Sequence, residues 1–514
     1  MIITSRPLDI VAVASYLVAM IVIGLYCSRR SKNSENYFVG RRSFPGWAVA
    51  LSMLATIVSS ATFLALPAAA YVLDWRQLTV NLMVPLVTVL AIVVFIPFFR
   101  RAGRTSAFEY LMDRFGPGAR LYGAVSFIML QQIRLAMILF LVALPMEFLT
   151  GAPLDAVIVG CGFFVALYAI VGGMETVFWA GVVQAVIMLV GGVLCLGFVT
   201  AELPGGLAQV IRVGGAHHKF SLGSFAWSPH ERTFYTVAIL GIVNWLTVFA
   251  GEQTMVQRYV SAGSLREARK ATAIFAAIAV PMWTMFFFIG TALFVFYREF
   301  PDPTIAKLQP DQVLPYFVFA HIPPGLAGIV VAAVLAAAMS SLDSGVNSIA
   351  TVTIVDLVRP YLAPGRSDRF YLNAARVATA AAILAMTLGA LLFSRLEKES
   401  MNDVSLTVAS VFGGCLMGLY MLGFFVPRVE GKSVNIALVP AVAFNLYLGL
   451  GAVGALPNSW KLGLHSYWTT AVVNGFFMAL AYGLSLGRKS LPRDLTGLTV
   501  WTLPAKQAEL HKGQ

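Results

Sequence analysis

The chain has 514 residues, of which 59% are hydrophobic and only 12% are charged. Soluble domains usually have about 25% charged residues, so this composition excludes an ordinary soluble protein and indicates one that lies in a membrane. The net charge of +12 does not indicate a nucleic-acid partner, because no basic face combined with aromatic residues accompanies it.

Apolar runs recur along the whole chain, and their length of about 20 residues is what an α-helix needs to cross a membrane. A β-barrel would show short segments of alternating hydrophobicity instead. We therefore predict an all-α polytopic membrane protein with about 13 transmembrane helices. In chain order they are expected near residues 10–28, 46–72, 78–98, 121–147, 153–172, 176–200, 233–252, 271–297, 325–357, 371–394, 404–426, 433–451 and 467–486.

The segments between these runs are too short to bury a core of their own. We therefore expect one transmembrane domain over residues 1–486 and a cytoplasmic tail over 487–514. About two thirds of the Lys and Arg residues lie on the same side of the membrane as the loop 29–42, and basic loops favour the cytoplasm. This bias predicts an N-terminus outside the cell and a C-terminus inside.

The second predicted helix has a polar middle. Its sequence, "PGWAVALSMLATIVSSATFLALPAAAY", includes Ser52, Thr56, Ser59, Ser60 and Thr62. Such a run can interrupt the helix and free backbone carbonyls, which bind sodium. The alternative is that small and hydroxyl residues let neighbouring helices approach closely.

The fourth predicted helix has Arg134 deep inside its apolar run. A buried guanidinium needs an anionic or dipolar partner, and the few acidic residues in the predicted helices do not obviously pair with it. The carboxylate of a bound solute is one candidate partner, and backbone carbonyls of the protein are the other.

The ninth predicted helix contains "AAAMSSLDSGVNS", although a carboxylate at membrane depth costs at least about 2.5 kcal/mol. At about 100° per residue, Ala337, Ser340, Ser341 and Ser344 fall on one face, beside Asp343. Oxygen ligands of this kind suit a hard cation such as sodium. A lone carboxylate would also suit a proton relay, so the residues alone leave both possibilities open.

These residues belong to a set of motifs that resembles the sodium/solute symporter family. The other motifs are "GGMETVFWAGVVQ" at 172–184, "QRYVSAGSLREARKA" at 257–271 and "TSAFEYLMDRFG" at 105–116. The resemblance is strongest to the bacterial sodium-coupled sialic acid symporters, through "DW" at 74–75, "IPFFRR" at 96–101 and Arg134. It implies a LeuT-type fold of five-plus-five inverted repeats, with repeat one over 46–200 and repeat two over 233–426.

The resemblance implies that sodium is the coupling ion and that it binds between the second and ninth helices. The ligands would be backbone oxygens of Ala55, Val58 and Ala337 and hydroxyl oxygens of Ser340 and Ser341.

A second cation site of the family is altered in this chain. An aspartate of that site is replaced by Gly181, whereas one of its hydroxyl positions is Asp343. One hypothesis is that Asp343 replaces the missing charge, in a second cation or proton site together with Ser340 and Ser344. The other is that the second site is absent and Asp343 forms hydrogen bonds within the protein.

The resemblance also implies a solute pocket. The lining residues would be Ser59, Thr62, Asn81 and Arg134, with Gln77 near the outer edge of the pocket. Asn244 and Thr247 of the seventh helix are further candidates. One expected hydroxyl position is Ile57, which removes a polar contact.

We therefore expect a sodium-coupled symporter in the cell (inner) membrane, surrounded by membrane lipid, that imports a small polar solute. The expected solute is a carboxylate such as sialic acid or another sugar acid, and the alternative is a neutral sugar or polyol. An enzyme is not expected, because neither a paired acid and base nor a metal cluster is visible in the predicted helices. A membrane sensor or a channel is the alternative of a different class.

Overall fold

A computed structural model describes residues 6–28, 44–102, 106–395, 404, 407, 413–452, 456–488 and 494–502. These residues form helices and connecting loops, and within them the sole β-type pairing is an isolated bridge between Phe44 and Ala262. The predicted cytoplasmic loop 29–42 lies outside the described residues, as do 489–493 and 503–514 of the predicted tail. The expectation of an all-helical protein is confirmed for the described residues.

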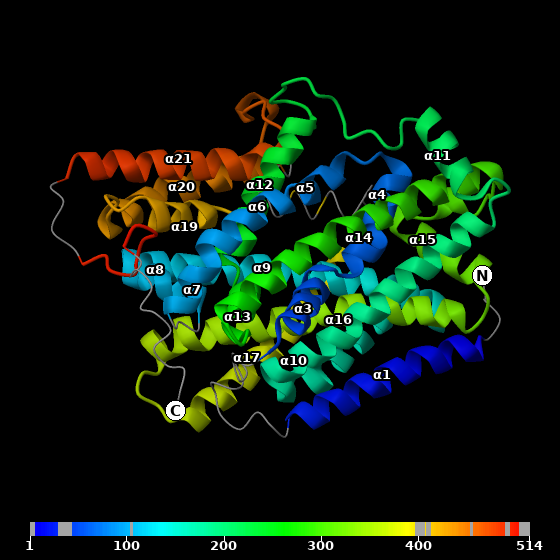
Figure 1. Ribbon diagram of the computed structural model, residues 1–514, viewed down its shortest axis with the longest axis horizontal. Coiled ribbons are helices and arrows are strands. Elements are labelled where there is room, and N and C mark those ends of the chain that lie inside the picture. The colour runs from blue at the N-terminus through cyan, green and yellow to red at the C-terminus, as the bar shows by residue number, and fades with distance from the viewer. Residues whose placement is uncertain are drawn as a thin grey trace.

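Many of the longer helices, among them α1, α16 and α21, run along the long axis of the molecule (Figure 1). Their bounds are α1 (Pro7–Ser28), α3 (Gly46–Ile57), α4 (Leu66–Val72), α5 (Thr79–Leu82), α6 (Val84–Leu90), α7 (Ile96–Ala102), α8 (Ala107–Phe115), α9 (Pro117–Thr150), α10 (Leu154–Ala201), α11 (Gly206–Ala216), α12 (Phe234–Gly251), α13 (Gln253–Ser261), α14 (Leu265–Glu299), α15 (Pro310–His321), α16 (Leu326–Val352), α17 (Asp368–Phe393), α19 (Leu416–Phe425), α20 (Gly431–Ala452) and α21 (Thr469–Leu486). Three π-helical segments, η1 (Ala61–Ala65), η3 (Ala91–Phe95) and η5 (Thr353–Leu362), continue or join these helices.

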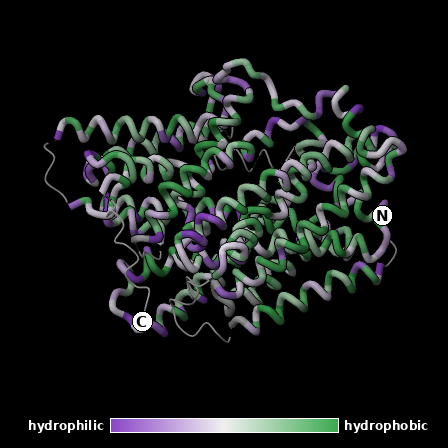
Figure 2. Tube along the Cα trace, in the orientation of Figure 1, coloured by the Kyte–Doolittle hydropathy of each residue, from purple (hydrophilic) through white to green (hydrophobic). Residues whose placement is uncertain are grey.

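Within the described residues, 10 helices are long and apolar enough to cross a membrane, or up to 11 when the bent pair Gly46–Ile57 and Ala61–Val72 counts as one span. Apolar residues run along most of the trace in Figure 2, as expected for helices surrounded by lipid. The predicted spans 153–172 and 404–426 coincide with the shorter apolar helices Leu154–Leu167 and Leu416–Phe425. A multi-pass membrane protein is therefore confirmed, whereas the number of thirteen spans and their orientation stay predictions.

Helix α10 covers two predicted spans and is helical throughout. If it were straight, Cys161 and Gly191 would lie about 45 Å apart at 1.5 Å per residue. However, Gly191 packs against Ala333 of α16, and Cys161 lines a cavity together with Leu335 of the same helix. Because Ala333 and Leu335 are close neighbours, α10 turns back on itself, and its two halves both pack along α16.

Helix α16 is the central helix of the bundle. All of its residues are buried except Leu326 and Ile329. A helix that is buried on every side needs neighbours all around it, which are α1, α3, α9, α10 and α17. The polar residues of α16 therefore face other helices and not lipid.

The start of α16 is held by an acidic residue of α1. The fully buried Asp9 accepts hydrogen bonds at Oδ1 from the backbone nitrogens of Gly325, over 2.6 Å, and Gly328, over 2.8 Å. A negative charge is favourable at a helix N-terminus, where backbone N–H groups have no partner within the helix. This contact links the first helix of the chain to its central helix.

Candidate functional site

The second predicted span is interrupted in its polar middle. Helix α3 ends at Ile57, and the chain resumes a helical path at Ala61 after a bend of 63°. Val58, at the break, has an extended backbone conformation with ψ of 116°. A helix end leaves carbonyl groups without intrahelical partners, so the break makes the carbonyl oxygens of residues 55–58 available to a neighbouring helix.

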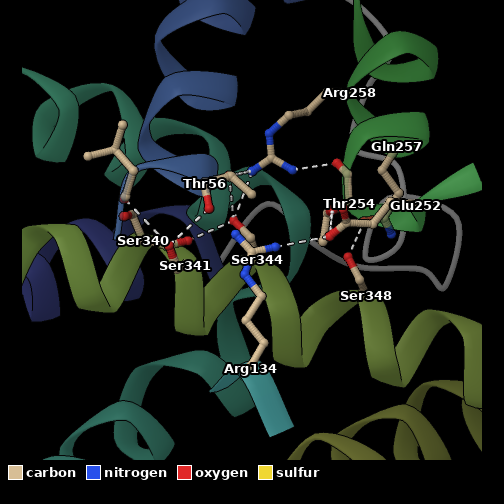
Figure 3. A network of polar contacts seen from close by, with 11 residues as sticks. Thr56, Arg134, Glu252, Thr254, Gln257, Arg258, Ser340, Ser341, Ser344 and Ser348 are labelled. Carbon is tan, nitrogen blue, oxygen red and sulfur yellow. Dashed lines mark hydrogen bonds and ion pairs between the residues drawn. The ribbon is translucent and has the colours of Figure 1, made fainter. Parts of the chain in front are cut away.

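The serines of α16 lie against these carbonyls (Figure 3). The Ser340 hydroxyl donates to the Ala55 carbonyl over 2.7 Å and to the Ala337 carbonyl over 3.0 Å. The Ser341 hydroxyl donates to the Thr56 carbonyl over 2.9 Å and contacts the Val58 carbonyl at 3.5 Å. All the residues proposed as sodium ligands from the sequence are therefore brought together.

The chemistry of this cluster suits sodium. It contains carbonyl and hydroxyl oxygens, the uncharged ligands that hard cations accept, and all of its residues are buried. Oxygens that ligate one cation at about 2.3–2.6 Å lie only a few ångström from each other, as these oxygens do. A cation could therefore replace the hydroxyl-to-carbonyl hydrogen bonds without a large movement of either helix.

Arg258 of α13 reaches the same two helices. Its guanidinium donates to the Ser344 hydroxyl over 2.8 Å and to the Thr56 hydroxyl, and its other amino group donates to the Thr254 carbonyl over 2.7 Å (Figure 3). Sequence reasoning missed this residue. The available signal was a basic residue six positions after the seventh predicted span, within one of the quoted motifs.

Asp343 lies on a different face of α16 from Ser344. Met339 is one helical turn before Asp343, and its sulfur accepts a hydrogen bond from the Tyr16 hydroxyl of α1. The charge of Asp343 acts on the same Tyr16 hydroxyl. Ser344 instead donates to the Ser340 carbonyl over 2.8 Å and faces α3. The structure therefore joins Ser340 and Ser344, and a cation or proton site at Asp343 stays a prediction.

Gly181 of α10 faces α3 beside the sodium cluster. A Cβ atom at this position would lie 3.5 Å from the Ser52 hydroxyl and 3.6 Å from the Ala55 side chain. Both are ordinary contact distances, so there is space for a side chain to begin here. A carboxylate at this position would therefore point toward the helix that carries Thr56.

A cavity of about 230 Å³ lies on the other side of the break in α3. A single water needs only about 10–15 Å³, so this cavity has room for an organic solute. It is lined by six of the seven predicted solute residues, namely Ser59, Thr62, Asn81, Arg134, Asn244 and Thr247. Ile57 lines it as well, which places an apolar side chain where a hydroxyl was expected.

Gln77 is the predicted solute residue that does not line the cavity. It is buried in the turn before α5, with its amide nitrogen 3.5 Å from the Tyr467 hydroxyl. A role for Gln77 near the outer edge of the solute pocket therefore stays a prediction.

Arg134 has a protein partner that the sequence did not reveal. Its Nη1 donates to Oε1 of Glu252 over 3.2 Å, and Glu252 is the residue that separates α12 from α13. The side chains of Arg134 and Glu252 are 28% and 11% exposed, and both line the cavity. The remaining N–H groups of the Arg134 guanidinium make no hydrogen bond to any described residue. They are therefore available to an anionic group in the cavity.

Comparisons with known proteins agree with this geometry. A model of the sodium:solute symporter family matches residues 37–434. The chain is 31% identical over 443 residues to the sodium/sialic acid symporter NanT of Aliivibrio fischeri, covering 86% of this chain and 87% of the relative. It is 30% identical over 428 residues to the sodium/sialic acid symporter SiaT of Proteus mirabilis, covering 83% and 86%.

A solved structure has a similar fold. It is the substrate-bound, outward-open state of a Na+-coupled sialic acid symporter, with a TM-score of 0.84 and 27% identity over 94% of this chain and 98% of that one. The family match covers the broken helix α3, the cavity and the serines of α16. The chain therefore belongs to the sodium:solute symporter family, and it is a membrane transporter and not an enzyme.

Proposed function

We propose that this protein is a sodium-coupled symporter that imports a small organic acid, of the class of sialic acid and other sugar acids. The observation that carries the proposal is that one helix break serves two sites. Carbonyls of Ala55 and Val58 lie at the serines of α16, whereas Ser59 and Thr62, directly after the break, line the cavity with Arg134.

The acidic nature of the solute rests on Arg134. A planar guanidinium matches a carboxylate with two parallel hydrogen bonds, and here its free N–H groups lie at a cavity with polar side chains from several helices. Glu252 accepts one of its bonds and keeps the guanidinium oriented. The relatives are sialic acid symporters, which agrees with a carboxylate at this position.

The shared break also provides the coupling. Sodium bound between α3 and α16 would hold the break in the conformation that places Ser59 and Thr62 at the cavity. Solute binding would then be stronger with sodium bound, and by linkage sodium binding would be stronger with solute bound. Because the two sites stabilise the same conformation, neither ligand needs to touch the other.

The energy comes from the sodium gradient. A sodium ion that enters gains about 2.3 kcal/mol for each 100 mV of membrane potential, and a solute with one negative charge loses the same amount. The concentration gradient of sodium adds to this. Since no bond in the solute changes, the protein needs only to change which side of the membrane its cavity faces.

The arrangement in the membrane is part of the proposal. About thirteen spans would form inverted repeats over residues 46–200 and 233–426. The N-terminus would lie outside and the tail from residue 487 inside the cytoplasm. The protein would be a multi-pass component of a bacterial inner membrane in contact with lipid, without a nucleic-acid partner.

Uptake into proteoliposomes tests the function. We expect labelled N-acetylneuraminic acid to accumulate only when sodium is higher outside, with a rate that saturates in both solute and sodium. A channel would give flux without saturation or accumulation, and a sensor would give none. If neutral sugars were accumulated and no sugar acid competed with them, the neutral sugar or polyol alternative would replace the acid.

A further inference from the structure

Arg258 is a fully buried cation without an acidic partner among the described residues. Its side chain is 1% exposed, and its amino groups donate to Thr254, Thr56 and Ser344, all of which are neutral. Glu252 is the acid whose charge acts on it, but the carboxylate of Glu252 bonds to Arg134 and to the Thr254 hydroxyl. A charge that is buried in the protein without a hydrogen-bonded counter-ion is costly and indicates a functional role.

A single residue, Ser344 or Thr56, connects the guanidinium of Arg258 to the residues of the proposed sodium site. Ser344, which accepts from Arg258, donates to the Ser340 carbonyl over 2.8 Å. Thr56, which also accepts from Arg258, presents its carbonyl to the Ser341 hydroxyl over 2.9 Å. Arg258 therefore connects α3 and α16 at the level of the sodium site, and it uses the two hydroxyl oxygens that a further cation in this space would need.

No carboxylate faces this place from α10. The residue there is Gly181, whose missing side chain would begin 3.5 Å from the Ser52 hydroxyl. Ser52 precedes Thr56 by one helical turn, and the Thr56 hydroxyl donates to its carbonyl over 2.9 Å. No described carboxylate is hydrogen-bonded to the guanidinium, so the positive charge of Arg258 at the two hydroxyls repels any other cation that would bind to them.

We propose that Arg258 is a built-in cation that occupies the Thr56 and Ser344 hydroxyls and excludes a second sodium ion. The chain then binds a single sodium ion, at Ser340 and Ser341. This inference deepens the proposed function and rests on it in one respect, the charge of the solute. One sodium ion with one monovalent sugar acid carries no net charge, so transport by the parent chain is electroneutral.

A single added carboxylate tests the proposal. In Gly181→Asp the new side chain compensates Arg258 and adds a charged oxygen ligand toward Thr56, so a second sodium ion can bind. Gly181→Asn is the matched control, because it has the same size and no charge. Sodium binding is measured with labelled sodium on the purified full-length chains in lipid nanodiscs, without solute.

We expect one sodium ion per chain for the parent and for Gly181→Asn, and two for Gly181→Asp. Two ions bound by the parent would overturn the proposal, as would a second ion in Gly181→Asn or a single ion in Gly181→Asp. A parent chain that binds no sodium would refute the sodium site itself. The number of ions therefore separates failure of this inference from failure of the proposed function.

Transport under an imposed potential gives a second measurement. With a potassium diffusion potential that is negative inside, uptake of a monovalent sugar acid by the parent and by Gly181→Asn is expected to stay unchanged. Uptake by Gly181→Asp is expected to rise severalfold, because two sodium ions with one anion carry a net positive charge inward. If uptake of the acid by the parent rose equally, a second cation would have to enter with it, and the proposal would be overturned.

Discussion

Arg134 of α9 donates to Glu252 across the wall of the solute cavity, over 3.2 Å between Nη1 and Oε1. The two residues are 118 positions apart in the chain. Their side chains meet at the junction between α12 and α13 (Figure 3). A solute carboxylate that binds Arg134 must therefore share the guanidinium with Glu252 or displace it.

Arg134→Lys keeps the positive charge and removes the planar guanidinium group with its parallel N–H donors. Charge-assisted hydrogen bonds contribute about 1.5–3 kcal/mol each, so we expect the half-saturating concentration of a sugar acid to rise about 10–100-fold. Competition uptake in proteoliposomes measures it. An analogue without the carboxylate serves as the control, and an equal loss of affinity for that analogue would contradict a direct contact between Arg134 and the carboxylate.

Glu252→Gln keeps the shape of the side chain and removes its charge. The solute carboxylate then no longer competes with a protein carboxylate for Arg134, so we expect its affinity to rise by up to about tenfold, or about 1.4 kcal/mol. Binding of the labelled acid to the purified variant measures it. A weaker affinity would mean that the main role of Glu252 is to position the guanidinium.

Ser340→Ala and Ser341→Ala each remove a hydroxyl from the proposed sodium site. We expect each to raise the sodium concentration for half-maximal uptake about tenfold, since a desolvated cation loses one oxygen ligand. Ser348→Ala is the control, because Ser348 is a buried serine of the same helix that bonds to Gln257 instead. Unchanged sodium dependence in both site variants would remove α3 and α16 as the sodium site.

Asp343→Asn tests whether the carboxylate belongs to a cation site. Because Asp343 lies on the face of α16 toward Tyr16, we expect the number of bound sodium ions and the sodium dependence of uptake to stay unchanged. Binding of labelled sodium, and uptake between about pH 5.5 and 8, measure this. A buried carboxyl with a raised pKa would change its protonation state in that range. Loss of a bound ion or of a pH dependence seen in the parent would restore the hypothesis that Asp343 binds a cation or proton.

Asp356→Asn tests a buried ion pair in the first turn of η5. Asp356 is fully buried, lies 2.8 Å from Arg120 and accepts from the Ser106 hydroxyl over 2.5 Å. Removing one partner of a buried pair costs about 3–5 kcal/mol, so we expect a clear fall in the melting temperature in detergent. Asp155→Asn is the matched control, because its pair with Arg395 is exposed and such pairs contribute about 0–1 kcal/mol. Equal melting temperatures for the two variants would contradict the expected difference.

The local features of this protein follow from its amino-acid order. The length of the apolar runs predicts membrane helices, because an α-helix must satisfy its own backbone in lipid. The hydroxyl residues around Thr56 and Ser341 indicate a helix break and an oxygen-rich face, because side-chain spacing determines which residues share a face. The break at Val58 and the contact of Ser340 with Ala55 agree with these expectations.

The pairings between distant residues were decided by the tertiary structure. Arg258 meets Thr56 across 202 positions, and Arg134 meets Glu252 across 118. Periodicity shows which face of a helix a residue occupies, but the packing of helices determines which other helix that face meets. For the same reason Arg258 came to lie beside the proposed sodium site although it is distant from it in sequence.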